Sequence, residues 1–399
     1  MAEPVWALGL MCGTSMDGVD AALVLTNGET IADFGPGAET PLAPEAAPHA
    51  RAVHADWRAY REGRLPAALA AAGAEVAELH AAAAAALLAR SGAETPAIVG
   101  FHGQTVAHAP EAGWTWQIGD AAALARALNR PVAWDFRTAD VAAGGEGAPL
   151  APLYHAALVR RIGAEGPVAV LNLGGVGNVT WIDPELSPEA PGALLAFDTG
   201  PANAPIDDWM RRRAGLARDE DGAAAAAGRV AEDRLARNAP AAFLARRPPK
   251  SLDRNAFADL LGALDDLSTE DGAATLAALC ARMAAAAADW FPRPASRWWV
   301  AGGGRRNPAL MAMLADRVAA PVAPVEAAGL DGDLLEAQAF AHLAVRVARG
   351  LPLSLPGTTG CAAPTPGGRV VRPPAAPQPP GRARIGAAES PASDIRRAT

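Results

Sequence analysis

Apolar and polar positions in the first third of the chain form short apolar runs separated by glycine-bearing turns, a pattern typical of β-strands. The expected strands cover residues 5–11, 19–25, 30–34, 97–100 and 131–136, and the expected helices cover residues 65–90 and 120–128. Asn27-Gly28 indicates a hairpin between the second and third strands, and Asp120 is suited to cap the second helix. This order predicts a β-meander followed by alternating helices and strands.

A similar order of elements recurs in the second half. Strands are expected over residues 167–173, 179–182, 194–197 and 297–301, with helices between about 204 and 291, from 308 and over 334–349. The repeat predicts two related α/β domains that face one another across a ligand cleft. We expect a first domain over 1–138, completed by the helix over 334–350, and a second over 139–333. Residues 364–399, rich in proline and arginine, are expected to be a disordered tail.

Composition narrows the class of protein. The chain has 399 residues, 51% of them hydrophobic, and a formal net charge of −8 with no basic stripe, which argues against nucleic-acid binding. Its three cysteines lie far apart and lack metal-ligand spacing. The N-terminus does not read as a signal peptide, and no apolar stretch predicts a membrane span. We therefore expect a cytoplasmic protein with no membrane or nucleic-acid partner.

Several common nucleotide motifs are absent from the sequence. Lys250 is the one lysine among 35 lysines and arginines, and it follows two prolines rather than a phosphate-loop glycine. A Walker A loop and the strand lysine of protein kinases are therefore excluded. Neither GGVGNVT nor GGGRRN completes a GxGxxG dinucleotide fingerprint. Any phosphate cradle must then be built from hairpin turns.

Three glycine-bearing turns could form such cradles. Backbone amides and hydroxyls in a turn between two strands can hold phosphate, and carboxylates there can hold Mg²⁺ directly or through water. The nucleotide-binding candidates are Gly13, Thr14, Ser15, Met16, Asp17, Gly18, Val19 and Asp20 in the first turn, Gly174, Gly175 and Asn178 in the second, and Gly302, Gly303, Gly304 and Asn307 in the third. Asp17 and Asp20 are the metal candidates. Ordinary polar hairpins and a tight strand-to-helix turn are the alternatives.

Asp198 ends an apolar strand in the string FDTGP. An α/β enzyme commonly places its base at such a strand end, where the carboxylate faces a cleft. The alternative is an aspartate that caps the following helix. Neutral donors and acceptors at His102 and Gln104, with Arg137 and Asp140 after the next strand, suit sugar hydroxyls and a carboxylate. A histidine satisfied within the core is the alternative for His102.

The strings GLMCGTSMDGVDAAL, FHGQTVAHAP, QIGD, DFRTADVAAGGEGAPLAPLYH, LNLGGVGNVT, FDTGPAN, PPKS, GGGRRN and LLEAQAFAHLA occur in one order over residues 6 to 361. This series resembles the anhydro-N-acetylmuramic acid kinase family. The resemblance implies an α/β fold of the actin-like ATPase type (hexokinase, Hsp70, actin; RNase H-like) and an ATP-dependent, Mg²⁺-assisted kinase of an amino sugar. It also implies a homodimer that takes part in cell-wall recycling.

The resemblance assigns roles to two acids. Asp198 would be the catalytic base, and Glu336, which spacing alone does not single out, would face the sugar. This chain departs from the family pattern at Cys12, Glu146, Ala202 and the residues 252–255, where the family usually has serine, glutamine, glycine and a TGRE string.

Two other functions stay open from the sequence. A conventional sugar kinase on the same fold would use the aspartate to deprotonate a free hydroxyl, and no water would enter its product. A non-metabolic actin-like ATPase would spend ATP on partner binding, without sugar-stimulated release of ADP.

Overall fold

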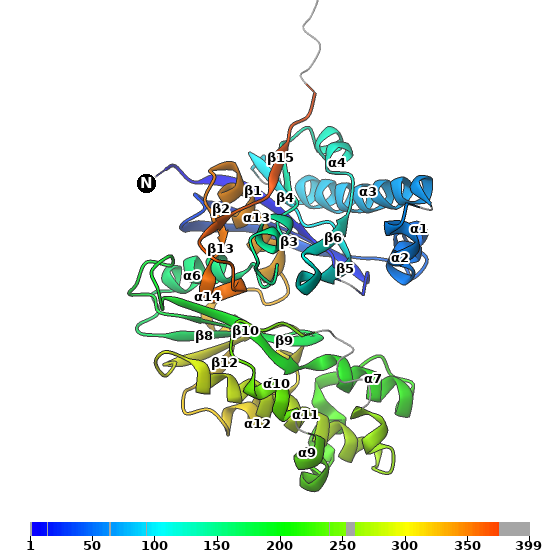
Figure 1. Ribbon diagram of the computed structural model, residues 1–399, viewed down its shortest axis with the longest axis vertical. Helices are drawn as coiled ribbons and strands as arrows, with labels where there is room; N and C mark the ends of the chain where they lie inside the picture. Colours follow the sequence, from blue (N-terminus) through cyan, green and yellow to red (C-terminus); the bar gives the residue numbers. More distant parts are fainter. Residues whose placement is uncertain are drawn as a thin grey trace, which may run out of the picture.

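The structure is a computed structural model that describes residues 2–13, 15–63, 65–92, 94–238, 240–252 and 260–374. The predicted phosphate-turn residue Thr14 and the predicted tail from residue 375 onward lie outside these ranges. Figure 1 shows two lobes stacked along the long axis, each built around one sheet.

The first sheet has six strands in the order β15-β7-β4-β1-β2-β3. The strands are β1 (Val5–Met11), β2 (Gly18–Thr26), β3 (Ile31–Pro41), β4 (Ile98–Phe101), β7 (Val132–Trp134) and β15 (Arg369–Val371). β1, β2 and β3 form an antiparallel meander, and β4 and β7 add to β1 in parallel. The meander was predicted from the sequence. A separate hairpin of β5 (Gln104–Ala109) and β6 (Trp114–Ile118) follows β4, and its first strand was not predicted.

Helices cover both faces of the first sheet. They are α1 (Pro48–Ala55), α2 (Trp57–Arg61), α3 (Pro66–Ser91), α4 (Ala121–Leu128) and, from the far end of the chain, α13 (Leu335–Ala348). Alternate residues of β1 point to opposite faces, so Leu8 and Leu10 join the cluster with α3 while Ala7 packs on the α13 side. At Gly9 a Cβ would lie 1.7 Å from the Ala337 carbonyl oxygen, so α13 can rest on this sheet only because glycine is there.

The expected start of the disordered tail at residue 364 is wrong. β14 (Thr365–Pro366) pairs with β13 (Pro352–Ser354), and β15 extends the first sheet by antiparallel pairing with β7. Ladder hydrogen bonds to β7 satisfy the side of the β15 backbone that faces the sheet, and Val370 packs against the core on the α13 side. A proline-rich composition hid these strands because they are short and lie at a sheet edge, where proline is tolerated.

The second sheet repeats the strand order of the first. Its order is β10-β9-β8-β11-β12, which corresponds to β3-β2-β1-β4-β7. The strands are β8 (Val168–Leu173), β9 (Val176–Ile182), β10 (Leu194–Pro201), β11 (Arg297–Ala301) and β12 (Val322–Pro324). Again the first three are antiparallel and the last two are added in parallel. The expected duplicated α/β architecture of the actin-like type is confirmed.

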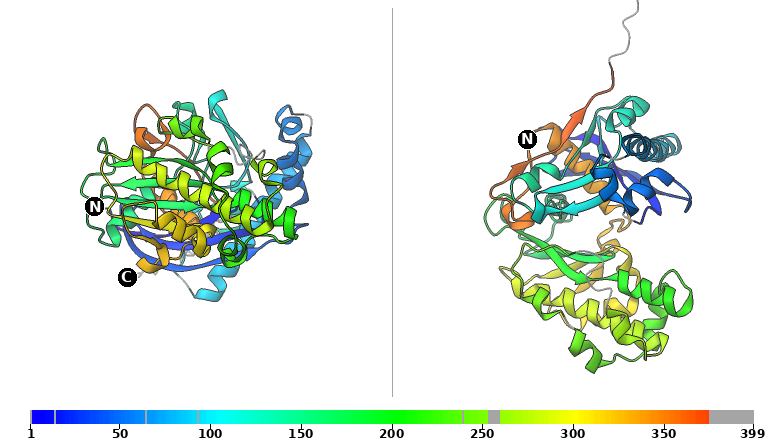
Figure 2. Two further views of the ribbon diagram at one scale, coloured as in Figure 1. Left: turned by 90° about the horizontal axis from the view of Figure 1, so that it is seen from below. Right: turned by 45° about the vertical axis from the view of Figure 1, so that its right-hand side comes forward.

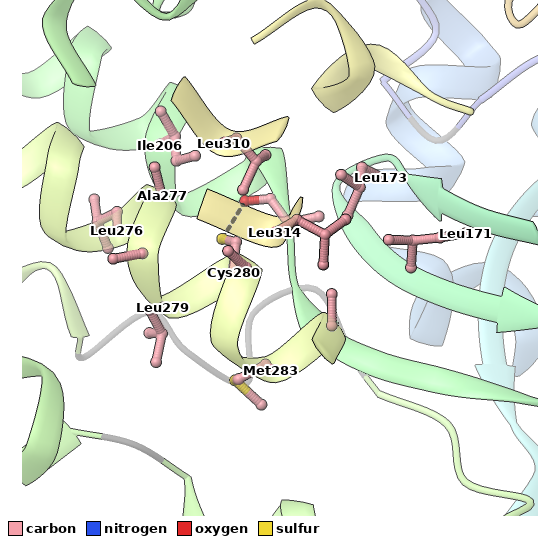
Figure 3. Close-up of a cluster of buried hydrophobic side chains, with 14 of the residues drawn as sticks. Leu171, Leu173, Ile206, Leu276, Ala277, Leu279, Cys280, Met283, Leu310 and Leu314 are labelled. Atoms are coloured by element: carbon pink, nitrogen blue, oxygen red, sulfur yellow. Dashed lines mark hydrogen bonds between the residues drawn. The ribbon is translucent and has the colours of Figure 1, made fainter. Parts of the chain in front are cut away.

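Helices of the second lobe pack under its sheet. They are α7 (Asn203–Ala214), α8 (Ala223–Ala227), α9 (Glu232–Asn238), α10 (Ala241–Ala245), α11 (Thr269–Ala285) and α12 (Pro308–Ala315), with 3₁₀ turns η2 (Glu220–Gly222), η4 (Gly262–Leu264), η5 (Ala286–Trp290) and η6 (Gly303–Arg306). Figure 3 shows α11 at the centre, where Leu276 and Cys280 lie among side chains of α7, α12 and β8. The Cys280 thiol donates to the Ala202 carbonyl at 2.9 Å, which ties this core to the segment after β10.

The chain crosses between the lobes twice. α5 (Thr138–Ala142) and α6 (Pro152–Arg161) lead from the first sheet to the second, and η7 (Val325–Ala328) leads back to α13. α14 (Pro356–Thr359) and the short 3₁₀ turn η1 (Pro110–Ala112) complete the elements. The buried Tyr154 hydroxyl of α6 donates to Gln338 of α13 at 2.6 Å, so the two crossing helices are bonded to each other. The right-hand view of Figure 2 shows the two lobes, one above the other, joined through the middle of the molecule.

One helix of the described residues, Pro66–Arg90, is long and apolar enough by length and composition to cross a membrane. It forms most of α3, and its Val76, Ala84 and Leu87 side chains are buried against the first sheet. A core helix rich in alanine can have the same length and composition as a membrane span.

Candidate active site

A cavity of about 190 Å³ lies where the two lobes meet. Its polar lining comes from both lobes and from both crossing helices: Arg137, His155, Asn172, Asn178, Asp198 and Glu336. The structure therefore brings together the two acids that the sequence assigned to catalysis, with Arg137 beside them.

Asp198 lies on β10 where the pairing with β9 changes register between Asp198 and Gly200. Its Oδ2 accepts a hydrogen bond from the Leu252 amide at 2.8 Å, and its own amide donates to the Lys250 carbonyl at 2.9 Å. Burial raises the pKa of Asp198 to about 7, the Leu252 amide opposes this, and the charge of Glu146 raises it further. Helix α7 has Ala202 as its N-cap without a side-chain bond, so the alternative role of Asp198 as a helix cap is excluded.

Glu336 lies in the first turn of α13 and is exposed to the space between the lobes. Asn172 donates to its Oε1 at 3.4 Å, from the second lobe. Desolvation by the walls of the cavity raises the pKa of Glu336, and the charge of Arg137 and the hydrogen bond from Asn172 oppose this. Burial lowers the pKa of Arg137 to about 10, and Glu336 and Asp140 counter this. Arg137 thus stays protonated at neutral pH and faces a carboxylate across the cavity.

The first glycine turn joins β1 to β2. Met16 adopts φ 52° and its carbonyl accepts from Arg51 Nη2 at 2.6 Å, while Gln104 Nε2 donates to the Gly13 carbonyl at 3.2 Å. Ser15 donates to Asp17 Oδ1 at 2.7 Å. Burial raises the pKa of Asp20 to about 7, and Glu39, Glu336, Asp333 and Asp17 raise it further. This turn therefore combines a fixed backbone with an excess of negative charge.

The second glycine turn joins β8 to β9 and is fastened to the start of α7. Amides of Asn203 and Ala202 donate to the Gly174 and Gly175 carbonyls at 2.8 and 3.2 Å. Asn178 follows on β9, opposite Asp198 in the register, and lines the cavity. The amides at the start of α7 therefore fix the conformation of the second turn.

The third turn opens a second pocket of about 170 Å³, next to the second turn. Gly303, Asn307, Asn203 and Arg306 line it, together with residues 218–221. Gly302 has φ 74°, and a Cβ there would lie 2.4 Å from Asn172 Oδ1, so the backbone must be bare at this point. Asn307 accepts from the Leu310 amide at 3.0 Å as the N-cap of α12, so its side chain shapes the pocket through the helix start.

Three predicted substrate residues do not line the Asp198 cavity. His102 is buried, accepts at Nε2 from Arg137 Nε at 3.1 Å and donates from Nδ1 to the Gly103 carbonyl, so it is neutral and orients Arg137. Burial also lowers its pKa well below the usual range. Gln104 supports the first turn instead. Asp140 is buried and accepts from the Gly147 amide at 2.6 Å and from Ser354 and Thr359. Its carboxylate therefore holds loops together and does not make the substrate contact that was expected.

Sequence reasoning missed four residues around the base. His155 and Asn172 line the cavity, and their only signal was their position in the motif strings. Glu146 and Ser251 form a hydrogen bond at 2.6 Å beside Asp198. Glu146 was noted only as a departure from the family pattern, and nothing in the sequence indicated that it meets the PPKS string, 105 residues away.

Two sheets of one strand order, each with a glycine turn at its first hairpin and a shared cavity with acids from both sides, define a member of the actin-like ATPase class. The model of the family "Anhydro-N-acetylmuramic acid kinase" matches residues 5–372. The chain belongs to this family of kinases.

Curated relatives match over nearly the whole chain. An anhydro-N-acetylmuramic acid kinase of Cereibacter sphaeroides is 60% identical over 92% of this chain and 96% of its own, and one of Roseobacter denitrificans is 52% identical over 93% and 95%. Among solved structures, component A of (R)-2-hydroxyglutaryl-CoA dehydratase from Acidaminococcus fermentans has a TM-score of 0.46 at 11% identity, covering 86% of this chain and 99% of that one.

Proposed function

We propose that this chain uses ATP to open and phosphorylate 1,6-anhydro-N-acetylmuramic acid, giving N-acetylmuramic acid 6-phosphate and ADP. The observation that carries the proposal is Asp198, a strand-end carboxylate whose pKa is raised to about 7 in a cavity that both lobes line. A base with a pKa near the working pH is the most effective general base. Family membership supports the choice of sugar.

The mechanism assigns each atom a place. Asp198 takes a proton from a water molecule as the water oxygen bonds to the anomeric carbon. The C1–O6 bond breaks, and O6 attacks the γ-phosphorus of ATP while the bond to the ADP oxygen breaks. Leu252 holds Oδ2 of the base, which leaves Oδ1 for the water. Arg137 would bind the lactyl carboxylate of the sugar, and Glu336 would accept from a sugar hydroxyl.

The three glycine turns would hold the nucleotide. The first and second turns would bind the phosphates from the two lobes, and the pocket at Gly303 and Asn307 would take the adenosine. Clamping from both sides positions the γ-phosphate in line with O6, which is most of what an enzyme contributes to phosphoryl transfer.

Mg²⁺ fits the first turn. The charges of four other acids raise the pKa of Asp20, an unfavourable arrangement that a divalent cation would relieve. Within the described residues, no group of three or more His, Cys, Asp or Glu side chains could hold a metal ion. The ion would therefore take most of its ligands from phosphate oxygens and water, with Asp17 and Asp20 completing the shell, and would supply charge neutralisation.

The resemblance also supports a homodimer in the cytoplasm. Light scattering on the purified chain would test the dimer, and cell fractionation would test the location.

An ADP-release assay in water enriched in ¹⁸O tests the function. Sugar-stimulated ADP release with one heavy oxygen at C1 of the product is the expected result. Release without incorporation of label would identify a conventional sugar kinase, and release indifferent to any sugar would favour the non-metabolic ATPase. N-Acetylglucosamine and glucose serve as control sugars.

A further inference from the structure

The side chain of Lys250 is buried in a cage that belongs to no part of the mechanism above. It is 3% exposed, and its Nζ donates to the carbonyls of Phe243 and Leu244 at 3.0 and 3.3 Å, near the end of α10. The rings of Phe243, Phe197 and Trp290 lie 4.6, 5.5 and 5.5 Å from Nζ. A helix end with negative dipole and three ring faces forms a site suited to a cation.

The cage needs an ammonium group in particular. Every other one of the 35 cationic residues is arginine, so the composition of this chain disfavours lysine wherever arginine can serve. A compact ammonium carries three rotatable donors, whereas the planar guanidinium is wider and donates in a fixed fork. An arginine at this position would have to fit its wider guanidinium among the same three rings.

The backbone of the same segment holds the base. Asp198 donates its amide to the Lys250 carbonyl at 2.9 Å and accepts at Oδ2 from the Leu252 amide at 2.8 Å. Phe197, which forms one wall of the cage, immediately precedes Asp198. Between the two contacts, Ser251 bonds to Glu146 of the crossing segment. Residues 250–252 therefore lie along the base, with the lysine side chain as their fixed point in the second lobe.

We propose that Lys250 is a positioning residue for Asp198: the caged ammonium fixes residues 250–252 so that the Leu252 amide holds one carboxylate oxygen and directs the other at the reacting water. This role rests on the proposed function for its chemistry, but the positioning itself concerns only this chain. Without the anchor, the segment can shift, and a misplacement of about 1 Å at a reacting group can cost about 100-fold in rate.

The charged groups around the base define what a test must hold constant. Glu146 on the crossing segment, His155 on α6, Arg137 after β7 and Glu336 on α13 all face Asp198 or its cavity. None of them is altered by a change at Lys250. Lys250→Met also removes a positive charge, whereas Trp290→Leu keeps it, so a shift of the Asp198 titration in both variants reports the Leu252 hydrogen bond, which stabilises the charged form.

The test compares full-length wild type, Lys250→Met and Trp290→Leu, the latter keeping the lysine and removing one wall. The carboxyl of Asp198 is followed by ¹³C NMR on protein labelled at aspartate Cγ, with Asp198→Asn to identify its resonance. We expect the titration midpoint of Asp198 to rise by about one pH unit in Lys250→Met and by less in Trp290→Leu, because the hydrogen bond from the Leu252 amide weakens. The kcat should fall about 10- to 100-fold in Lys250→Met at unchanged KM for ATP.

Leu264→Ala is the matched control, since it leaves a cavity in the same core but removes none of the rings or carbonyls of the cage. It should lower the melting temperature without moving the titration of Asp198. Unchanged titration in folded Lys250→Met and in Trp290→Leu would overturn the positioning role, and so would an equal shift in Leu264→Ala. If Lys250→Met does not fold, Trp290→Leu decides alone. A wild type without sugar-stimulated ADP release but with the NMR shifts would overturn the proposed function and leave the positioning of Asp198 standing.

Discussion

The two glycine turns occupy equivalent places in two sheets of one strand order, yet they are held in different ways. Side chains hold the first turn from outside, with Arg51 on the Met16 carbonyl and Gln104 on the Gly13 carbonyl. The second turn is held by amides of the segment that follows β10, Ala202 and Asn203 among them. The two sheets repeat one strand order, but the contacts that hold each glycine turn differ between the lobes.

The difference extends to charge. The first lobe contributes the acids beside its turn, where a metal–phosphate group would neutralise them. The second lobe contributes the base, and the same short segment after the base fastens its phosphate turn. A change in the first half should therefore act mainly on nucleotide affinity, and a change in the second half mainly on the rate of the chemical step.

The largest expected effect is at the base. Asp198→Asn should lower kcat by about 10²- to 10⁴-fold, because the amide cannot accept the proton of the water. It should leave ATP affinity within about two-fold by calorimetry, since the phosphate turns are untouched. Asp316→Asn on the exposed end of α12 is the matched control. Phosphorylation by Asp198→Asn near the wild-type rate would remove the base assignment.

The next effect concerns the first turn. Arg51→Met removes the donor to the Met16 carbonyl and keeps most of the apolar stem, so the turn loses a charge-assisted hydrogen bond worth about 1.5 kcal/mol or more. We expect ATP to bind about 10-fold more weakly, with kcat changed far less.

Asn203→Ala gives the contrasting case in the second turn. It removes the side-chain hydrogen bond to the Leu173 carbonyl at 2.8 Å and one polar group of the proposed adenosine pocket, but it keeps the backbone amides, so the loss in ATP affinity should be about three-fold. Calorimetry with a non-hydrolysable ATP analogue measures both variants. Equal losses would show that the two turns are not fastened differently.

A smaller effect is expected on the pH profile. Glu146→Gln replaces a charge that raises the pKa of Asp198 with a neutral group that can still accept from Ser251. The base must be ionised to act, so the acid limb of kcat/KM should move to lower pH by about half a unit. Glu78→Gln on the exposed face of α3 is the control. An acid limb that stays in place would show that this charge does not reach the base.

Much of the frame could be predicted because it rests on local pattern. The apolar runs at residues 5–11 and 167–173 fixed both central strands, and Asp120 caps α4 as expected, with its Oδ1 2.8 Å from the Ala123 amide. β15 was missed because an edge strand of three residues is set by its partner β7 and not by its own composition. The duplicated order was visible because both lobes use the same spacing of strand and glycine turn.

The site could be predicted only for residues whose own motif places them at the cavity, and not for contacts between segments far apart in the sequence. Asp198 and Glu336 line one cavity, and their catalytic roles stay predictions. His102, Gln104 and Asp140 were predicted to bind the substrate because their polar groups suit sugar hydroxyls, but each makes a hydrogen bond to another protein group. The contact between Glu146 and Ser251 joins segments 105 residues apart, and no local pattern encodes such a pairing.

The last prediction concerns the effect of the Asp198 carboxyl on the free energy of unfolding. In the folded chain the pKa of Asp198 is raised from 3.8 to about 7, so its neutral form is favoured by folding. Stability from this group is fully present below about pH 4 and is lost as the pH rises through 7. Asp198→Asn has no such titration, so it should gain stability over wild type as the pH rises from 4 to 7, by up to about 4 kcal/mol, which is what a rise of the pKa from 3.8 to about 7 corresponds to. Urea unfolding at a series of pH values measures the difference. Parallel curves for the two proteins would mean that burial does not destabilise the ionised Asp198 carboxylate.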